Sequence, residues 1–286
     1  MKNHGIRIAP ALAIATAFFF QALPGNAQTT VSGTVGISAG AMNYSQTDDS
    51  EAGNISGFAI DGNANVEFGG WEFMLDINGV RHRDSRGTAH HYAPWGVASY
   101  GLHAGRTIGN AYVGGFIGGN AFQGRRASTP DGFVTGTLWG VEGKFEPASM
   151  SGVTFFGQLG RAIMVGDPGD VAFIGTFARL GTDVAVGNDF GLMVSAEFGR
   201  SPNIFEDSGD WGEYRLVTIE GRYQPSNIIY SVGGEIGQFI ANTEDSAVSN
   251  RLFAKVTIPF GPKPKRNLLK TPYGPGLAAA WAYVLD

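Results

Sequence analysis

The feature that most constrains this chain is an alternation of side-chain types that recurs along most of its length. Between Val31 and Ala41, apolar residues alternate with Ser, Thr and Gly. Between Trp71 and Asn78, Trp, Phe, Leu and Ile alternate with Glu, Met, Asp and Asn. A period of two places the two kinds of residue on opposite faces of a strand, whereas a helix needs a period of about 3.6. The pattern therefore predicts an all-β chain.

The alternating segments are twelve in number and long. Most have ten or more residues, while strands of soluble sheets usually have about 5 to 6. Tilted strands of about 9 to 11 residues are long enough to cross a lipid bilayer. The predicted strands are residues 31–43, 55–68, 71–81, 96–106, 111–122, 132–145, 152–163, 171–184, 190–200, 213–223, 228–239 and 250–260.

The connections between these segments also alternate in character. Short turns are expected at 69–70, 107–110, 146–151, 187–189 and 224–227, and longer polar loops at 44–54, 81–94, 123–131, 201–212 and 240–249. The connection at 164–170 lies on the side of the longer loops but is itself short. Lipid offers no partners to backbone groups, so a sheet spans a membrane only when it is closed. The pattern predicts a single antiparallel transmembrane β-barrel of about twelve strands, with short periplasmic turns and longer extracellular loops.

The first 27 residues differ from the rest of the chain. Lys2 and Arg7 precede an apolar run from Ala11 to Phe20, and small residues surround position 27. This order is typical of a cleaved secretory signal, and the run is too short for a membrane anchor. We therefore expect a signal peptide at 1–27, a barrel at 28–260 and a separate tail at 261–286, with the protein exported to the cell outer membrane.

Composition excludes several other classes of protein. The chain has no cysteine, which removes disulfides, thiol nucleophiles and Cys-ligated metals. Its net charge of -5 argues against binding to nucleic acid, which needs a concentrated basic surface. A hydrophobic fraction of 43% is too high for disorder, and 44 glycines are too many for an ordinary helical enzyme.

The charged residues of the strands indicate which face points inward. A Lys or Arg facing lipid at the membrane midplane costs about 2 to 4 kcal/mol, whereas a watery lumen accepts it. We expect inward charges to select permeants by sign and size, although they could instead pair across a filled interior. The candidate pore-lining residues are Glu67, Glu72, Asp76, Arg125, Arg126, Asp131, Glu142, Lys144, Arg179, Glu197, Glu220, Arg222, Glu235, Arg251 and Lys255.

The sequence gives little support for catalysis or metal binding. A membrane-embedded hydrolase needs a nucleophile or an activated water beside a positioned base. The histidines after the signal peptide are His82, His90, His91 and His103, and none lies in a His-x-Ser arrangement. His90 and His91 are expected in a solvated loop. No catalytic, cofactor-binding or metal-binding residue is predicted, and the chain is not expected to be an enzyme.

The last predicted strand carries the strongest resemblance to a known family. From Leu252 to Phe260 every second residue is apolar, and the strand ends in an aromatic residue. With the signal peptide and the segment 138–145, this resembles the porin-like outer-membrane β-barrel proteins of gram-negative bacteria. The resemblance implies a terminal strand that the barrel assembly machinery reads. It also implies contact with outer-membrane lipids and lipopolysaccharide, passive diffusion of small hydrophilic solutes or ions, no cofactor and a possible homo-oligomer. A structural or surface-interaction barrel with a plugged lumen, or a barrel hydrolase, remains an alternative.

The tail departs from that family, whose chains usually end at the terminal aromatic residue. Residues 261–286 contain four basic residues, four prolines and an apolar stretch at 276–285. The prolines argue against a regular element in the first half. The tail could lie in the periplasm, enter the lumen or touch anionic partners, and we expect a charged, disordered segment.

Overall fold

A computed structural model describes residues 29–46, 52–84, 96–124, 132–166, 171–204, 209–242, 246–262 and 267–285. The signal peptide predicted for residues 1–27 lies outside these ranges. The strands are β1 (Thr30–Gln46), β2 (Ala52–Phe68), β3 (Trp71–Asp84), β4 (Gly96–Ile108), β5 (Ala111–Gly124), β6 (Gly132–Phe145), β7 (Val153–Gly166), β8 (Val171–Val186), β9 (Phe190–Asn203), β10 (Gly212–Tyr223), β11 (Ile229–Ala241) and β12 (Ser246–Phe260).

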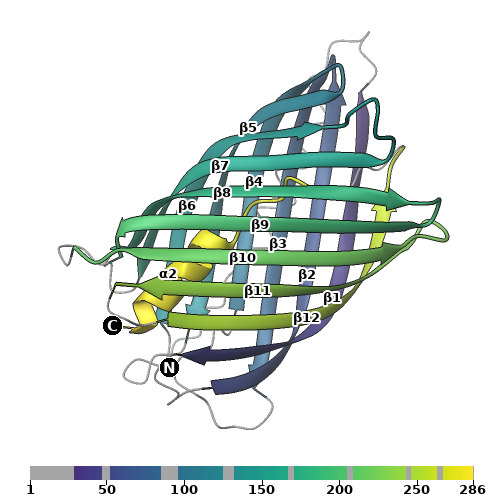
Figure 1. The fold of residues 1–286 in the computed structure, drawn as a ribbon. Helices are drawn as coiled ribbons and strands as arrows, with labels where there is room; N and C mark the ends of the chain where they lie inside the picture. Colours follow the sequence, from purple (N-terminus) through teal and green to yellow (C-terminus); the bar gives the residue numbers. More distant parts are fainter. Residues whose placement is uncertain are drawn as a thin grey trace, which may run out of the picture.

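The twelve strands form one closed antiparallel barrel (Figure 1). Each strand pairs with its neighbours in the sequence, and β1 pairs with β12 to close the ring. This closing seam runs from the pair Gly33 and Phe260 to the pair Gln46 and Ala247. The predicted fold class is therefore confirmed.

The strands are somewhat longer than the sequence pattern predicted, mainly at the end of the barrel where the connections are longer, here called the long-loop end. For example, β12 begins at Ser246 rather than at 250, because its pairing with β1 continues to Gln46. The opposite, short-turn end has compact connections. Gly69 and Gly70 join β2 to β3 with φ of 58° and 82°. Consecutive residues with positive φ are typical of a tight hairpin turn and favour glycine.

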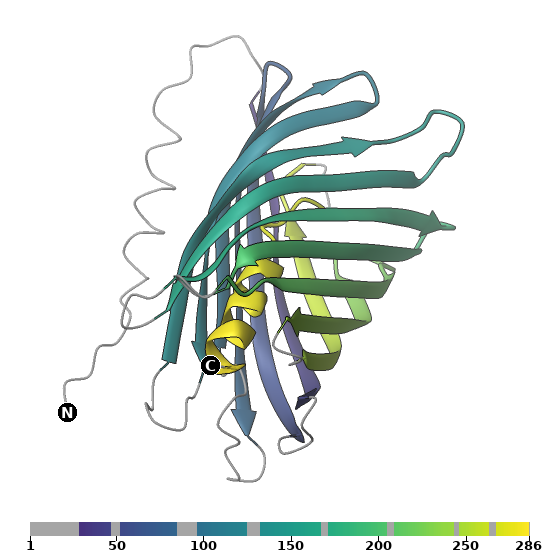
Figure 2. The ribbon, with the colours of Figure 1, turned by 60° about the vertical axis from the view of Figure 1, so that its left-hand side comes forward.

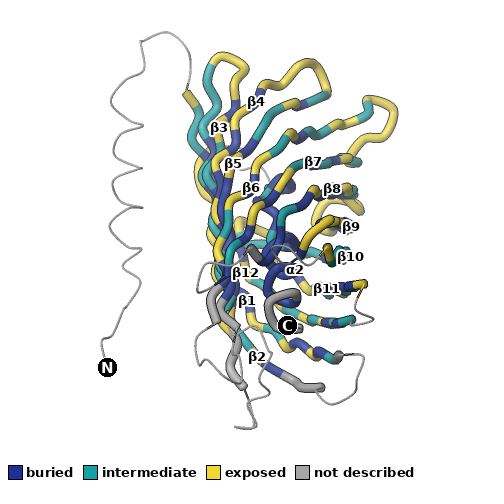
Figure 3. Tube along the Cα trace, turned by 90° about the vertical axis from the view of Figure 1, so that its left-hand side faces the viewer, coloured by how far each residue is buried: buried dark blue, intermediate teal, exposed yellow. Residues whose placement is uncertain are grey.

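The two faces of the sheet differ as the alternation predicted. On β6 the side chains of Trp139, Val141 and Phe145 lie on the outer face and are 38%, 61% and 50% exposed, whereas Glu142 points inward and is buried. Figure 3 shows buried and exposed residues alternating along the strands. The outer face is therefore apolar, and the charged side chains of the strands lie mostly inside.

Residues 267–285 of the tail lie inside the barrel, so the expectation of a disordered tail is wrong for these residues. Residues 267–273 form neither helix nor strand and bend at Leu268 and Leu269, and helix α2 (Gly274–Leu285) follows within the ring of strands (Figures 1 and 2). Pro275 is tolerated because it lies in the first turn of the helix, where its missing N–H would have no helical partner. Among the described residues, no helix is long and apolar enough to cross a membrane.

Because the backbone groups of a closed sheet are paired with one another, the folded protein should resist sodium dodecyl sulfate at room temperature. It should migrate differently on a gel after boiling, and its circular dichroism in detergent should be dominated by strand. A helical spectrum, or one gel position before and after boiling, would contradict the barrel.

Candidate functional site

The inner wall carries charge pairs formed between barrel strands. Lys144 on β6 lies 3.3 Å from Glu72 on β3, and Arg251 on β12 lies 2.9 Å from Glu235 on β11. Two further pairs are Lys255 with Asp61, at 2.8 Å, and Arg222 with Asp183. These pairs occupy the short-turn half and the middle of the barrel. Each charge of the four pairs has a partner on the wall itself, which matters because a buried charge without a partner is costly.

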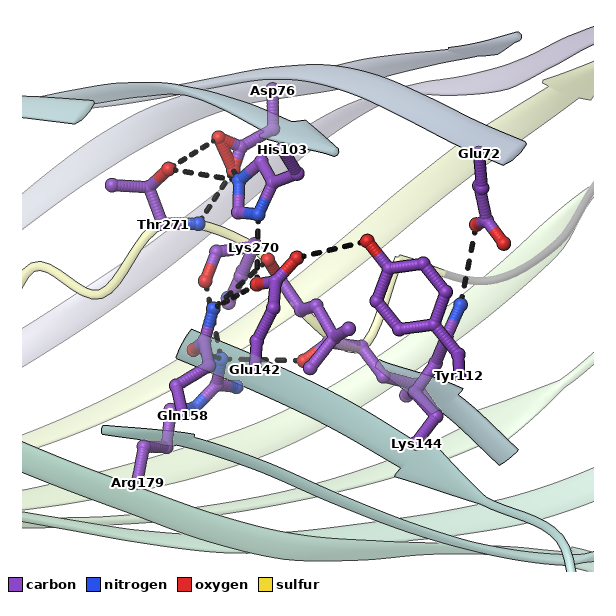
Figure 4. Close-up of polar contacts among 12 residues, drawn as sticks. Glu72, Asp76, His103, Tyr112, Glu142, Lys144, Gln158, Arg179, Lys270 and Thr271 are labelled. Carbon is purple, nitrogen blue, oxygen red and sulfur yellow. Dashed lines mark hydrogen bonds and ion pairs between the residues drawn. The ribbon is translucent and has the colours of Figure 1, made fainter. Parts of the chain in front are cut away.

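The non-helical part of the tail, residues 267–273, passes through a group of wall side chains that bind its main chain (Figure 4). Arg179 Nη1 donates to the carbonyl oxygens of Leu268 and Lys270, both at 3.3 Å. Gln158 donates to the carbonyl of Leu269 at 3.1 Å. Asn120 donates to the carbonyl of Pro272 at 3.1 Å, and Asp76 accepts the N–H of Thr271 at 2.5 Å. We call these four wall residues, Asp76, Asn120, Gln158 and Arg179, the collar.

His103 and Glu142 lie on the wall next to the collar and hold it and Thr271 in place through hydrogen bonds. Glu142 accepts hydrogen bonds from His103 Nδ1 at 2.9 Å and from Gln158 at 3.0 Å. His103 Nε2 lies 3.3 Å from the Thr271 hydroxyl, which donates to Asp76 at 2.7 Å. All five side chains of this network are buried: Asp76, His103, Glu142, Gln158 and Thr271. Because buried polar groups need hydrogen-bond partners, each depends on the others. The network fixes the position of Thr271 in the lumen.

A Thr hydroxyl beside a His that is itself bonded to a carboxylate could in principle act as a nucleophile with its base. Here the Thr271 hydroxyl already donates to Asp76, and the side chain is only 1% exposed. The arrangement therefore holds the tail rather than presenting a nucleophile to solvent. Among the described residues, no group of three or more His, Asp or Glu side chains could hold a metal ion.

Glycines shape the contact between wall and tail. A Cβ on Gly101 of β4 would lie 1.9 Å from the Thr271 hydroxyl oxygen, and one on Gly118 of β5 would lie 2.9 Å from Thr271 Cγ2. On the tail, a Cβ on Gly276 would lie 2.0 Å from the ring of Phe122. Real Cβ atoms do not come this close, so the tail sits where it does only because these positions lack a side chain.

Helix α2 fills the long-loop half of the lumen. Its residues Leu277 to Trp281 are buried among inward apolar side chains, and the ring of Trp281 lies 6.5 Å from that of Tyr44 on β1. A helix that is apolar all round is suited to burial on all sides. The apolar lining belongs to one cluster that includes Met42, Tyr44, Phe116, Phe122, Leu138, Met164, Phe173, Phe177, Tyr214 and Phe239.

The first turn of α2 lies against a buried carboxylate. A Cβ on Gly274 would lie 2.2 Å from Glu197 Oε1, and Glu197 also accepts a hydrogen bond from Tyr214 at 2.7 Å. A negative charge is favoured at a helix N-terminus, where backbone N–H groups lack helical partners. Lys270 lies on the tail just before this turn, and burial, together with the charges of Lys255 and Arg179, lowers the pKa of its ammonium group.

The predicted pore-lining residues on the strands all lie on the inner face. Glu67 is placed there by its pairing with Glu72, and the others are buried or half-buried inside the ring: Glu72, Asp76, Glu142, Lys144, Arg179, Glu197, Glu220, Arg222, Glu235, Arg251 and Lys255. Arg125, Arg126 and Asp131 lie outside the described residues, as do His90 and His91. That the inward residues line a pore stays a prediction, because tail residues occupy the lumen beside several of them.

Sequence reasoning missed the neutral and tail residues of the site. Asn120, Gln158 and Thr271 carry no charge, so the argument from lipid exclusion did not single them out. His103 was considered only as a possible hydrolase residue. A signal was present, since His103 shares the inward face of its strand with Ser99 and Gly101, opposite Tyr100 and Leu102.

The closed barrel, with an apolar outer face and with charged side chains on its inner wall, has the fold of outer-membrane β-barrel proteins. No protein-family model and no curated protein matches the sequence. The solved structures that resemble it include the translocator domain of the autotransporter NalP from Neisseria meningitidis. That domain is 14% identical, with a TM-score of 0.45, and the match covers 86% of this chain and 95% of that chain.

Two other similar structures are outer-membrane proteins as well. Outer-membrane expressed OmpT of Vibrio cholerae is 12% identical with a TM-score of 0.42, and the match covers 83% of this chain and 99% of that chain. The outer membrane channel DcaP of Acinetobacter baumannii is 9% identical with a TM-score of 0.40, and the match again covers 83% and 99%. At these values the likeness carries no argument about function, and the fold is assigned from the strand pairing of this chain itself.

Proposed function

We propose that this protein is an outer-membrane channel for small hydrophilic solutes or ions, and that its own C-terminal segment closes the lumen. The observation that carries this proposal is the pairing of charges along the wall. Lys144 with Glu72, Arg251 with Glu235, Lys255 with Asp61 and Arg222 with Asp183 all pair strand to strand. These charges would keep their partners if the tail left, and the short-turn half and the middle of the lumen would then be polar and filled with water.

The way in which the tail is attached supports the same function. The described residues of the tail contribute no strand to the sheet, which closes through β1 and β12. The tail is joined to the barrel at Phe260, the last residue of β12. It can therefore leave without breaking a strand pair. An apolar outer face suits lipid, so we place the barrel in the outer membrane, in contact with its lipids, and reached through the predicted signal peptide. We propose no catalytic role.

A second candidate is a permanently closed barrel that serves a structural or surface-interaction role. The observation in its favour is the apolar cluster around α2, which includes Phe122, Phe173 and Trp281. Exposing one large apolar side chain to water costs about 1.5 to 3 kcal/mol, so the departure of this helix would be costly. The two candidates differ in one measurable property, which is conductance.

Planar-bilayer recordings test the choice between them. We expect the full chain to be closed for most of the time, with rare openings, and a chain ending at Phe260 to conduct continuously. Both chains should show the gel shift on boiling, which checks that the shorter chain has folded. A full chain that never opens, together with a folded but non-conducting shorter chain, would contradict the channel and favour the permanently closed barrel.

A further inference from the structure

Three arginines on nearby strands face outward, although the charged side chains of the strands lie mostly inside the barrel. They are Arg161 on β7, Arg200 on β9 and Arg215 on β10, and all three are exposed. Each lies in the half of its strand nearer the long-loop end. An outward Arg is costly at the membrane midplane and is tolerated near the interface. Their positions therefore favour an anionic partner at the level of the lipid headgroups.

Strand pairing brings the three arginines together on the outer face. Arg161 is paired with Thr176 on β8, Thr176 with Arg200, and Arg200 with Glu213 on β10. Neighbouring strands are about 4.8 Å apart, so the Cα atoms of Arg161 and Arg200 lie roughly 10 Å from each other. Arg215 lies two residues beyond Glu213, on the same face of β10. We call Arg161, Arg200 and Arg215 the basic patch.

The contacts of the basic patch leave its guanidinium groups open to a ligand. Arg200 and Arg215 flank Glu213 at 3.6 Å and 3.7 Å, and each of the two arginine side chains is 57% exposed. Arg200 also lies over the ring of Trp211, at 5.5 Å from its centroid. Among the described residues, Arg161 has no ion-pair partner. Three positive charges therefore meet the one carboxylate of Glu213, and most of their N–H donors remain available.

The outer face around the basic patch changes in character along the strands. Toward the long-loop end, the outward residues include Thr135, Thr137 and Thr176 as well as the patch. The ring of Trp211 beside the patch is typical of the membrane interface. Toward the short-turn end, the outward residues of β6 to β10 are mostly apolar, among them Val141, Phe155, Leu180, Leu192 and Ile219. The basic patch thus lies where an apolar surface for acyl chains gives way to a polar one.

From this arrangement we propose that the basic patch binds the phosphate groups of a lipopolysaccharide headgroup, in the leaflet that the long loops face. The inference rests on the proposed placement of the barrel in the outer membrane. Guanidinium and phosphate groups form paired, charge-assisted hydrogen bonds. Because the three arginines come from three strands, they suit a headgroup with more than one phosphate better than a single phosphate. The apolar surface next to the patch suits the acyl chains of the same lipid.

Native mass spectrometry of the full chain in detergent tests the site. The barrel is offered lipid A, which is the phosphorylated membrane anchor of lipopolysaccharide, or phosphatidylglycerol. Inorganic phosphate is added in excess as a competitor, and the gel shift on boiling checks that each variant has folded. We expect the native chain to retain lipid A more strongly than phosphatidylglycerol, and we expect inorganic phosphate not to displace lipid A.

Single substitutions separate a binding site from a pair of strand-stabilising charges. Arg200→Gln should weaken the binding of lipid A about tenfold, since a hydrogen bond to a charged group contributes a factor of this order. Glu213→Gln should strengthen it, because this change removes the carboxylate that competes for two of the guanidinium groups. An unchanged affinity in Glu213→Gln would contradict the proposal. Arg106→Gln, which replaces an outward arginine near the short-turn end of β4, is the control and should change nothing.

Equal binding of lipid A by the native chain and by a folded variant with all three arginines of the patch replaced by Gln would overturn the proposal. So would equal retention of the two lipids, or loss of lipid A to inorganic phosphate, which would indicate a site for free phosphate. The measurement does not depend on conductance. A barrel that never conducts but prefers lipid A would contradict the channel alone, and a conducting barrel without this preference would overturn the lipid site alone.

Discussion

Replacing Gly276 by leucine should weaken the binding of the tail in the lumen while the sheet stays closed. Any Cβ at this position would lie 2.0 Å from the ring of Phe122, which is itself fully buried. Overpacking of this kind costs about 1 to 3 kcal/mol. This cost destabilises the packing of the tail in the lumen and not the pairing of the strands, because Gly276 belongs to α2. In the bilayer, this variant should therefore be open for much more of the time than the native chain.

The absence of cysteine makes the position of the tail directly measurable. Ala280→Cys places a single thiol on α2 at a buried site. With Gly276→Leu in the same chain, the thiol should react with a water-soluble maleimide about tenfold faster or more, given the cost of overpacking. The matched control is Gly79→Leu on β3, where a Cβ would meet nothing within 4 Å. Equal labelling rates in the two variants would contradict a tail seated by close contact at Gly276.

Replacing Phe260 by aspartate should nearly abolish insertion into the outer membrane. Phe260 is the last residue of β12 and pairs with Gly33 at one end of the closing seam. Its ring covers that glycine, because a Cβ on Gly33 would lie 2.4 Å from Phe260 Cζ. The substitution removes both the cover of the seam and the terminal aromatic residue that, by the family resemblance, the assembly machinery reads. Phe260→Trp should retain insertion.

Phe145→Asp is the control for the loss of a lipid-facing aromatic ring as such. Phe145 is another outward aromatic residue at the short-turn end, 50% exposed against 42% for Phe260, but it lies on β6. An acidic residue near the membrane interface costs little in itself, less than about 1 kcal/mol. Membrane fractionation should therefore find Phe145→Asp largely inserted. Equal loss of both variants would mean that Phe260 acts only as a lipid-facing ring.

The strands and their facing could be predicted because both depend on neighbouring residues. A period of two is visible within ten residues, and the cost of facing lipid assigns Glu142 and Lys144 inward without knowledge of any partner. The partners themselves could not be predicted in this way. Lys255 meets Asp61 from 194 positions away, and such a contact follows only from the register of the whole ring.

The tail was misjudged for a related reason. Prolines prevent a segment from bonding to itself, and from the sequence alone they therefore indicate disorder. Order requires only that the backbone groups find partners somewhere, and Arg179, Gln158 and Asn120 supply them from the wall. The apolar stretch at 276–285 was a usable signal, since an interior space offers it a place away from water. That space exists only once twelve strands have closed.

The course of the tail also sets an order of events during biogenesis. The chain leaves β12 at the short-turn end, and α2 lies toward the long-loop end, so the residues that follow the last strand cross the ring lengthwise. A helix with its side chains is about 10 to 12 Å across. Either the tail enters the ring unfolded, or the first and last strands join around it. A bulky domain fused to the C-terminus could not follow the helix through a finished ring, so such a fusion would mature with an empty lumen unless its tail was enclosed before the strands joined.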